Sequence, residues 1–347
     1  MNCLLEQNLK GVKAIVEQMG EKSFRGGQIY KALHLGLDFS EMTELSLALR
    51  EKLQNDFVAQ PLEIIKSLKS VDGTEKFLFK LKDGNVIEGV VMHYKYGATI
   101  CVSTQVGCRM KCAFCASGLH GLVRNLTASE ILGEVIAVNR YLGGGLKDKR
   151  KIINIVLMGS GEPFDNYDNV MQFLRLVSDP DGINISPRNV SLSTSGLVPG
   201  MIKFAEENLP VNLTVSLHSP FDDERQKIMP IAKAYSIDEI MKACDNYFNK
   251  TGRRYIFEYV LISGENDGER HRNELIKLLK GRPCHLNVIR LNEVKENNFK
   301  GTTEKDAYRF IGYLEKAGLS VTLRRKMGED IDGACGQLRQ RYIEENN

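Results

Sequence analysis

After residue 98, short β-branched apolar runs alternate with longer amphipathic stretches along this chain of 347 residues. Apolar runs of this length that alternate with helical stretches are typical of βα units, in which helices cover a parallel sheet. The repeat predicts an α/β fold whose sheet is either doubly wound or curled into a full or partial barrel. The expected strands are residues 98–104, 151–158, 188–194, 211–217, 254–262 and 284–291, with a shorter one at 320–325.

In the first hundred residues, the apolar side chains recur at different spacings from those of the core. Residues 1–60 carry apolar side chains at spacings of three and four, which predicts helices, with Ser40 as the N-cap of the third. From residue 61 the pattern is β-rich and is broken by Asp-Gly pairs at 72–73 and 83–84, which predict hairpin turns. We therefore expect a helical accessory domain over 1–60, a β-hairpin extension over 61–97 and a catalytic core over 98–347.

Composition excludes several classes of protein. Hydrophobic residues are 42% and charged residues 26%, which are ordinary values for a globular protein and exclude a disordered or fibrous chain. We see no apolar run long enough to cross a membrane, and the chain begins with acids and lysines where a secretory signal would be apolar. We expect a cytoplasmic protein. The net charge of +3 excludes a nonspecific polycation, although residues 101–150 hold 7 basic and 3 acidic side chains.

Cysteines gather immediately after the first predicted strand of the core. The chain has 8 cysteines, and Cys108, Cys112 and Cys115 form a C-x3-C-x2-C pattern. In a reducing compartment such a group indicates metal-binding or catalytic thiols rather than disulfides. Three thiolates on one loop can hold three irons of a cubane cluster and leave the fourth iron open. The alternative is a structural zinc ion, for which His120 or Cys101 would be the fourth ligand.

Polar, glycine-rich or cysteine-rich sequence follows most of the other predicted strands as well. Active sites of parallel α/β proteins lie in the loops after the carboxyl ends of the strands, where those ends meet. The sequence therefore predicts one shared pocket. The segments concerned are residues 105–115, 159–166, 195–197, 218–220 and 292–297.

These motifs together resemble a known family. CRMKCAFC, MGSGEP, STSG, SLHSP and DIDGACGQL resemble the signatures of the RlmN/Cfr family of radical S-adenosylmethionine RNA methyltransferases, from FRGGQIYKALH almost to the C-terminus. The resemblance implies a partial (β/α)6 barrel with an N-terminal helical domain. It also implies one [4Fe-4S] cluster on Cys108, Cys112 and Cys115, with S-adenosyl-L-methionine chelating the unique iron.

The reaction implied by the resemblance is methylation of adenosine carbon 2 in 23S rRNA and, in many members, in tRNA just 3′ of the anticodon. Carbon 2 lies between two ring nitrogens and is too electron-poor to attack an electrophilic methyl group. In this family a cysteine first accepts a methyl group by displacement. A 5′-deoxyadenosyl radical then abstracts a hydrogen atom from it, and the methylene radical adds to the base. A general base removes the carbon 2 proton, and a second cysteine releases the product through a disulfide.

Three residues match the reacting groups of that scheme. Cys335 matches the methyl-carrying cysteine, Cys101 the resolving cysteine and Glu88 the proton acceptor. Taken alone, Cys335 could be an inert surface thiol, Cys101 a core residue and Glu88 a solvated side chain. Because strand residues alternate between faces, Ile100 and Val102 point one way and Cys101 the other.

The pocket for S-adenosylmethionine carries over position by position. Gly161 and Glu162 match the motif that contacts the amino group of S-adenosylmethionine. The glycine lets the backbone approach the cofactor, and the carboxylate accepts a hydrogen bond from its ammonium group. Ser160 departs from the methionine that many members carry. Cys3, Cys244 and Cys284 match no motif. The other matched positions are Ser193, Ser216, Leu217, His218 and Asn292.

The resemblance also implies partners. These are 23S rRNA, tRNA and an electron donor of the flavodoxin or ferredoxin type. We expect a monomer that does not bind membranes. We consider residues 1–60 an RNA-binding element. Candidate phosphate contacts near the cluster are Arg109, Lys111, Arg124, Asn125 and the basic run 147–151, although a solvated face explains the run equally well.

Two other functions stay open. The sister class methylates carbon 8 and tends to read GEA where this chain has Gly161, Glu162 and Pro163, which favours carbon 2. A zinc-containing RNA-binding or assembly protein without catalytic activity would also carry clustered cysteines.

Overall fold

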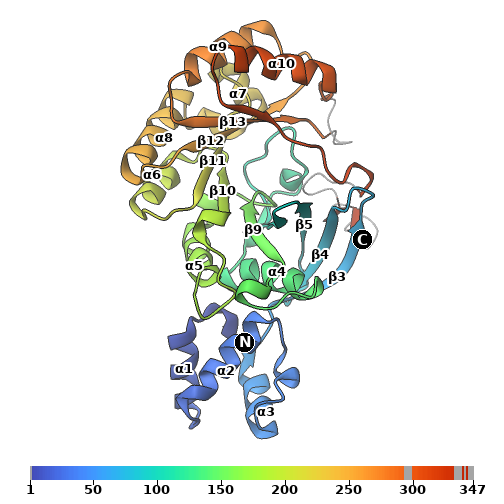
Figure 1. Ribbon diagram of the computed structural model, residues 1–347, viewed down its shortest axis with the longest axis vertical. Helices are drawn as coiled ribbons and strands as arrows, with labels where there is room; N and C mark the ends of the chain where they lie inside the picture. The colour runs from blue at the N-terminus through green and yellow to red at the C-terminus, as the bar shows by residue number, and fades with distance from the viewer. Residues whose placement is uncertain (1, 293–298, 332–337, 340, 343–347) are drawn as a thin grey trace.

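One open, curled sheet organises the molecule (Figure 1). The computed structural model describes residues 2–292, 299–331, 338, 339, 341 and 342. Parallel strands follow one another in chain order without the reversal that marks a doubly wound sheet, and the two edge strands do not pair, so the sheet is a partial barrel. The predicted α/β fold is confirmed. The parallel strands are β6 (Gly97–Cys101), β9 (Ile152–Leu157), β10 (Val190–Thr194), β11 (Asn212–Ser216), β12 (Tyr255–Leu261), β13 (Cys284–Arg290) and β14 (Val321–Leu323).

Three antiparallel strands continue the same sheet. They are β3 (Leu62–Lys69), β4 (Glu75–Leu81) and β5 (Val86–Tyr94), and β5 pairs antiparallel with β6. Both predicted Asp-Gly turns are present, with Gly73 at φ +87° and Gly84 at φ +88°. We call these three strands the β3–β5 extension; it is the wall of the barrel that precedes β6.

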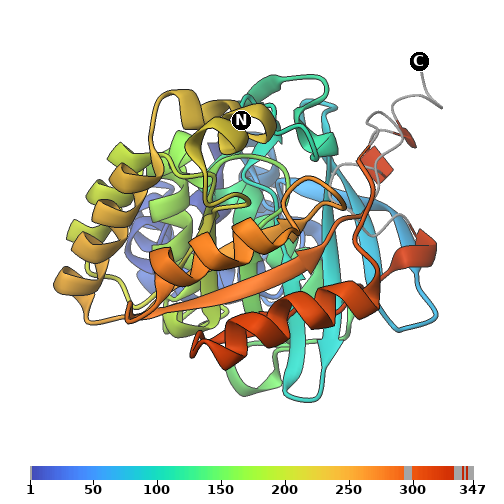
Figure 2. The same cartoon turned by 90° about the horizontal axis from the view of Figure 1, so that it is seen from above.

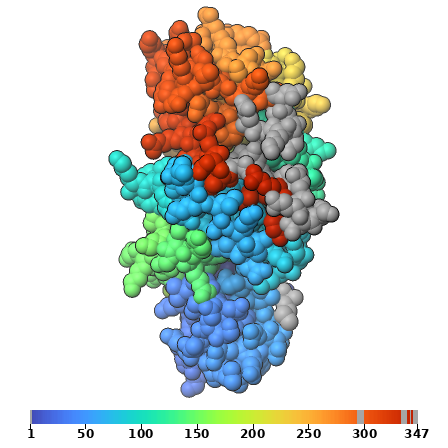
Figure 3. Space-filling model, turned by 90° about the vertical axis from the view of Figure 1, so that its right-hand side faces the viewer, coloured from blue at the N-terminus to red at the C-terminus, as the bar shows by residue number. Residues whose placement is uncertain are grey.

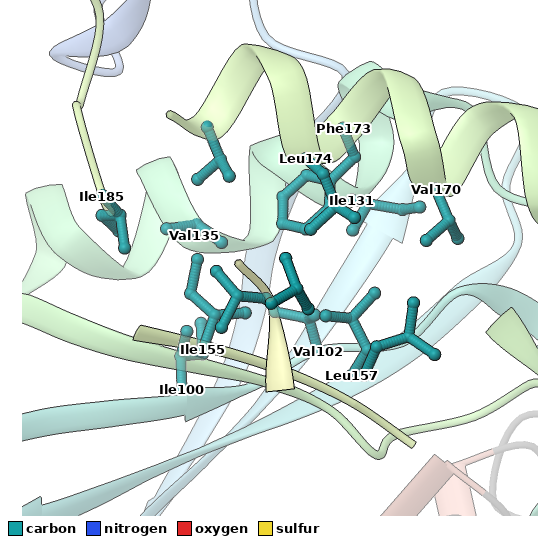
Figure 4. Close-up of a cluster of buried hydrophobic side chains, with 14 of the residues drawn as sticks. Ile100, Val102, Ile131, Val135, Ile155, Leu157, Val170, Phe173, Leu174 and Ile185 are labelled. Carbon is teal, nitrogen blue, oxygen red and sulfur yellow. The ribbon is translucent and has the colours of Figure 1, made fainter. Parts of the chain in front are cut away.

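Helices cover the outer face of the parallel strands (Figure 2). Apolar side chains of β6 and β9, among them Ile100 and Ile155, meet those of two helices, among them Val135 and Phe173, in the core (Figure 4). The first of these helices starts at a polar cap, because the side chain of Thr127 accepts a hydrogen bond from Glu130 N. The helices are α4 (Ala128–Tyr141), α5 (Tyr167–Val177), α6 (Val198–Glu206), α7 (Asp222–Ile228), α8 (Ile237–Thr251), α9 (Glu269–Leu279) and α10 (Glu304–Lys316).

The N-terminal helices pack on the outside of this barrel, below the sheet in Figure 1. The carboxylate of Glu6 accepts a hydrogen bond from Ser129 N at 3.1 Å, and Nδ1 of His34 accepts from Ile183 N at 3.1 Å. Polar contacts therefore fix this unit against the first barrel helix and the loop that precedes β10. Its elements are β1 (Asn2–Cys3), α1 (Leu9–Gln18), α2 (Ser23–His34), α3 (Leu47–Asp56) and β2 (Phe57–Val58).

The prediction that Ser40 caps the third helix is wrong. That helix begins at Leu47, and its N-cap is Ser46, whose side chain accepts from the backbone of the third helical residue. Residues 39–41 form a separate 3-10 turn, because Asp38 and Glu41 close a capping box on each other's backbone. Across the described ranges, no helix has the length and apolar character needed to cross a membrane.

Candidate active site

A cavity of about 350 Å³ lies at the carboxyl ends of the parallel strands. Most of the predicted site residues line it, from five different strands or the loops that follow them. Two do not: Leu217 is buried in the core, and Glu88 lies beside the cavity. Cys335 lies outside the described residues. The predicted residues that line the cavity are Cys101, Cys108, Cys112, Cys115, Gly161, Glu162, Ser193, Ser216, His218 and Asn292.

The three clustered cysteines lie between two short strands, β7 (Gln105–Gly107) and β8 (Leu122–Asn125), that pair with each other. Gly107 has φ +79°, and a Cβ there would meet the carbonyl oxygen of Gly121, so this loop can close only through glycine. Ala113 N donates to Ile228 O at 2.8 Å, which fastens the loop to the end of α7. The backbone thus fixes the loop at its base, where Gly107 meets Gly121, and in its middle, at Ala113.

The chemistry of these thiols fits the cluster that the family implies. Burial raises the pKa of Cys108 to about 12 and also raises the pKa of Cys112 well above its usual range. Such thiols become thiolates only when a metal supplies compensating charge. Cys108, Cys112 and Cys115 all line the same cavity, and three thiols of one loop are a donor set that fits a polynuclear iron–sulfur cluster.

The Gly-Glu pair after β9 forms an acceptor site in the cavity. Gly161 has φ +118°, and a Cβ there would lie 2.6 Å from Thr104 Oγ1. Oε2 of Glu162 accepts from Ser195 N at 2.7 Å and from Ser195 Oγ at 2.8 Å, while Oε1 accepts from Phe164 N at 3.1 Å. Burial raises the pKa of Glu162, although these donors oppose the rise. The carboxylate is therefore held rigidly and can accept from a cation.

His218 is held as a neutral ring. Its Nδ1 accepts from Val260 N at 3.0 Å, its carbonyl accepts from Asn266 Nδ2 at 2.8 Å, and its φ is +57°. Burial lowers its pKa to about 3, so the imidazole stays uncharged and carries its proton on Nε2. The ring of Phe114, from the cysteine loop, stands edge-on to it with centroids 4.8 Å apart. This contact joins the cysteine loop to the end of β11.

Arg225 on α7 is a site residue that the sequence analysis missed. It is 0% exposed. Its Nη2 donates to Ser195 O at 2.7 Å and to Ser216 O at 3.0 Å, and its Nε donates to Leu217 O at 3.0 Å. Burial lowers its pKa to about 10. Arg225 thus ties together the loops after β10 and β11, which carry the predicted cofactor contacts.

Cys101 lines the cavity, and its neighbours Ile100 and Val102 point into the core on the opposite face (Figure 4). The strand alternation inferred from the sequence is present. Cys101 pairs in register with Val90 of β5, which also lines the cavity. Cys101 therefore contributes a thiol to the cavity that does not belong to the cysteine loop.

Glu88 lies on the same face of β5 as Val90 and is 2% exposed. Its Oε1 lies 3.4 Å from Lys76 Nζ, and its Oε2 accepts from Arg339 N at 2.9 Å. Lys76 is another residue that the sequence analysis missed. The carboxylate is buried and paired beside the cavity, unlike a solvated side chain of an exposed strand.

The basic candidates for RNA binding are arranged differently from the prediction. Arg109 pairs with Asp165 at 2.7 Å, and Arg124 pairs with Asp83 and Glu130. The prediction that the run 147–151 lies near the cluster is wrong, because it precedes β9 and the cavity lies at the other end of that strand. Carboxylates therefore already neutralise two of the candidate phosphate contacts.

Comparison with known proteins agrees with this geometry. Residues 102–279 match the model of the Radical SAM superfamily, and residues 2–58 match that of the "Ribosomal RNA large subunit methyltransferase N-terminal domain". A radical SAM methyltransferase from Sphaerobacter thermophilus superposes with a TM-score of 0.92 at 39% identity, over 97% of this chain and 99% of that one. The partial barrel and its cysteine loop are those of a radical S-adenosylmethionine protein.

Two curated relatives define the family more closely. A "Probable dual-specificity RNA methyltransferase RlmN" from Clostridium perfringens strain 13 is 50% identical over 99% of this chain and 98% of its own length. A protein of the same name from Lachnoclostridium phytofermentans is 48% identical over 97% of this chain and 94% of its own length. The chain belongs to the RlmN family of radical S-adenosylmethionine RNA methyltransferases.

Proposed function

We propose that this protein methylates carbon 2 of an adenosine in 23S rRNA and of the adenosine 3′ of the tRNA anticodon, through a methylated cysteine. The observation that carries the proposal is the meeting of the three clustered cysteines, the Gly161–Glu162 acceptor site and the separate thiol of Cys101 in one cavity. A methyltransferase that only positions a nucleophile against S-adenosylmethionine needs neither a cluster nor a second thiol.

Cys108, Cys112 and Cys115 would hold the [4Fe-4S] cluster. Glu162 would accept from the ammonium group of S-adenosyl-L-methionine, since its carboxylate is fixed by Ser195 and faces the cavity. When bound, the cluster and S-adenosylmethionine supply the radical that activates the methylated thiol. Further contacts to the cofactor would come from Ser193, Ser216, Leu217, His218 and Asn292.

Two thiols and one carboxylate complete the reaction. Cys335 carries the methyl group, Glu88 takes the proton from carbon 2, and Cys101 forms a disulfide with Cys335 that releases the methylated base. The location of Cys101 in the cavity supports its part in this scheme. The disulfide must be reduced before another turnover, so the protein requires a reducing compartment. We infer a cytoplasmic monomer that receives electrons from a flavodoxin- or ferredoxin-type donor.

Mass spectrometry of nucleosides tests the proposal. 23S rRNA and tRNA are isolated from a deletion strain of the source organism, with and without a plasmid that carries this chain. We expect 2-methyladenosine to be absent without the chain and restored with it. Restoration of 8-methyladenosine would identify the sister class, and unchanged methylation in both pools would overturn the proposed function.

A further inference from the structure

The turn between β3 and β4 holds the chain just before residues 331–337. The carboxylate of Asp330 accepts hydrogen bonds from the hydroxyl of Ser70 and, at 3.1 Å, from Val71 N. Two residues earlier, Gly328 N donates to Asp72 Oδ2 at 2.9 Å. The hydrogen bond from Ser70 is the main cause of a lowered pKa of Asp330, so this contact is made by the ionised carboxylate. Residues 328–330 are thus fixed to one end of the β3–β5 extension.

The same extension holds the chain just after residues 331–337. Leu338 is buried and packs with Leu78 and Val86 in a small apolar cluster of its own. Arg339 Nε donates to Val86 O at 2.7 Å, and Arg339 N donates to Glu88 Oε2 at 2.9 Å. A backbone donor, a side-chain donor and an apolar side chain therefore anchor this second point to β4 and β5.

A buried ion pair supports the second anchor. Lys76 is 0% exposed and Glu88 2% exposed, and their charged atoms are 3.4 Å apart. Buried charges are tolerated only when they are paired and hydrogen-bonded, and removal of one partner strongly destabilises the other. Lys76 therefore keeps the carboxylate of Glu88 in the place where it meets Arg339 N.

The first anchor lies beside the cavity. Thr74, next to the turn that binds Asp330, lines it, and so do Arg324 and Met327, which lead into the first anchor. Figure 3 shows the last described residues lying against the surface of the β3–β5 extension. Cys335 is five residues after Asp330 and four before Arg339 in the sequence, so the described residues on both sides of it are fixed to the β3–β5 extension.

We propose that the β3–β5 extension is a docking platform that positions Cys335, with Asp330 and Glu88 as its two anchoring carboxylates. The inference rests on the proposed function in that Cys335 carries the methyl group. Asp330 and Ser70 are positioning residues, because they act on the cysteine through the chain between them. Glu88 would both anchor the segment and accept the proton from carbon 2.

The step that depends most directly on this positioning is the methylation of Cys335. A carbon–sulfur bond forms at Cys335 as the bond from the methyl carbon to the sulfonium sulfur breaks, S-adenosylhomocysteine leaves, and the thiol proton passes to water. The step needs neither RNA nor a base for carbon 2. Displacement requires in-line approach, and misplacement by about 1 Å can slow a reaction about 100-fold. Loosened anchors should therefore slow methylation of Cys335.

The experiment compares Asp330→Asn and Ser70→Ala with wild-type protein, each reconstituted with its cluster. Asp238→Asn is the matched control, because Asp238 pairs with Lys242 on the solvent-exposed face of α8, away from the β3–β5 extension in the sequence. Peptide mass spectrometry follows the fraction of methylated Cys335 over time without RNA. We expect Asp330→Asn to be slower by about 10-fold or more, Ser70→Ala to be slowed less, and the control to match wild type. Iron content should be equal in all four proteins.

Hydrogen exchange at residues 338, 339, 341 and 342 tests the anchoring apart from the chemistry. Glu88→Ala should increase exchange of the Arg339 amide, whose acceptor is lost. The docking-platform proposal is wrong, and the proposed function still stands, in either of two cases. One is that Cys335 is methylated at the wild-type rate in the Asp330→Asn and Ser70→Ala variants. The other is that Glu88→Ala leaves hydrogen exchange at Arg339 unchanged. If wild-type Cys335 is never methylated, the proposed function fails and the inference falls with it.

Discussion

Arg225 donates a hydrogen bond to the carbonyl of Ser195, 2.7 Å away, from a helix that follows a different strand. The same Ser195 donates two hydrogen bonds to Glu162. The buried guanidinium of Arg225 therefore fixes the backbone of Ser195, and Ser195 in turn fixes the carboxylate of Glu162. The acceptor site that we propose for the cofactor is thus held by contacts between loops from different βα units.

Arg225→Lys should weaken binding of S-adenosylmethionine. The three N–H donors of a lysine sit on one nitrogen, so they cannot reach all the carbonyls that Arg225 meets from two separate nitrogens, and each buried acceptor left without a partner costs about 1–3 kcal/mol. We expect the dissociation constant, measured by calorimetry on the reconstituted protein, to rise by about 10-fold or more. Arg254→Lys is the control, because Arg254 donates to the Cys284 carbonyl at the amino ends of the strands, away from the cavity. Equal affinities of the two variants would contradict the role given to Arg225.

Glu162→Gln should also weaken cofactor binding and change its dependence on pH. A hydrogen bond to a charged group contributes about 1.5–3 kcal/mol, which corresponds to a loss of about 10- to 100-fold in affinity. Because the pKa of Glu162 is raised above the usual 4.5, the carboxylate gains its proton at a higher pH than an ordinary glutamate. Affinity of the wild type should therefore fall as the pH drops towards that raised value. The effect should be smaller in the Gln variant, and parallel pH curves for the two proteins would refute this assignment.

Gly161→Ala should destabilise the fold. The new Cβ would lie 2.6 Å from Thr104 Oγ1, at a φ of +118° that side chains rarely adopt. Such strain costs about 1–3 kcal/mol, which denaturant unfolding can measure. Gly312→Ala on α10 is the control, since nothing lies within 4 Å of a Cβ there, and helical alanine should be neutral or stabilising. The account fails at this point if the two substitutions change the free energy of unfolding alike.

Cys108→Ala should abolish the cluster. A cubane with two protein ligands is poorly held, so we expect the iron content after anaerobic reconstitution to fall to a small fraction of the wild-type value. Cys284→Ala is the control, because Cys284 is a buried thiol on β13 that lies outside the cavity and should leave the iron content unchanged. Retention of iron in the Cys108 variant, or stoichiometric zinc in the wild type, would count against a cluster at this loop.

Much of the barrel could be predicted from local patterns of apolar and polar residues in the sequence. Each predicted strand of the core is present within a few residues, because buried parallel strands leave strong apolar runs between polar loops. Alternation along β6 also placed Cys101 on the face opposite Ile100. The shared pocket could be predicted because all of its loops leave the same edge of the sheet.

The supporting residues could not be predicted in the same way. Lys76 stands among apolar residues of β4 and would be an exposed strand residue if the sheet face were open to solvent. The chain near Leu338 covers that face, and this contact joins residues more than 250 positions apart. Arg225 lies in the charged sequence DDER, which is typical of an exposed helix, and its burial depends on loops from two other βα units.

The most direct test of the proposed reaction uses S-adenosylmethionine whose methyl group carries three deuterium atoms. The reconstituted protein, preloaded with this cofactor, is incubated with protein-free 23S rRNA and a chemical reductant, and the nucleosides are analysed by mass spectrometry. If a hydrogen atom is abstracted from the methyl group on Cys335 before transfer, the product is 2-methyladenosine with two deuterium atoms. A product that retains all three would show intact methyl transfer and would contradict the account.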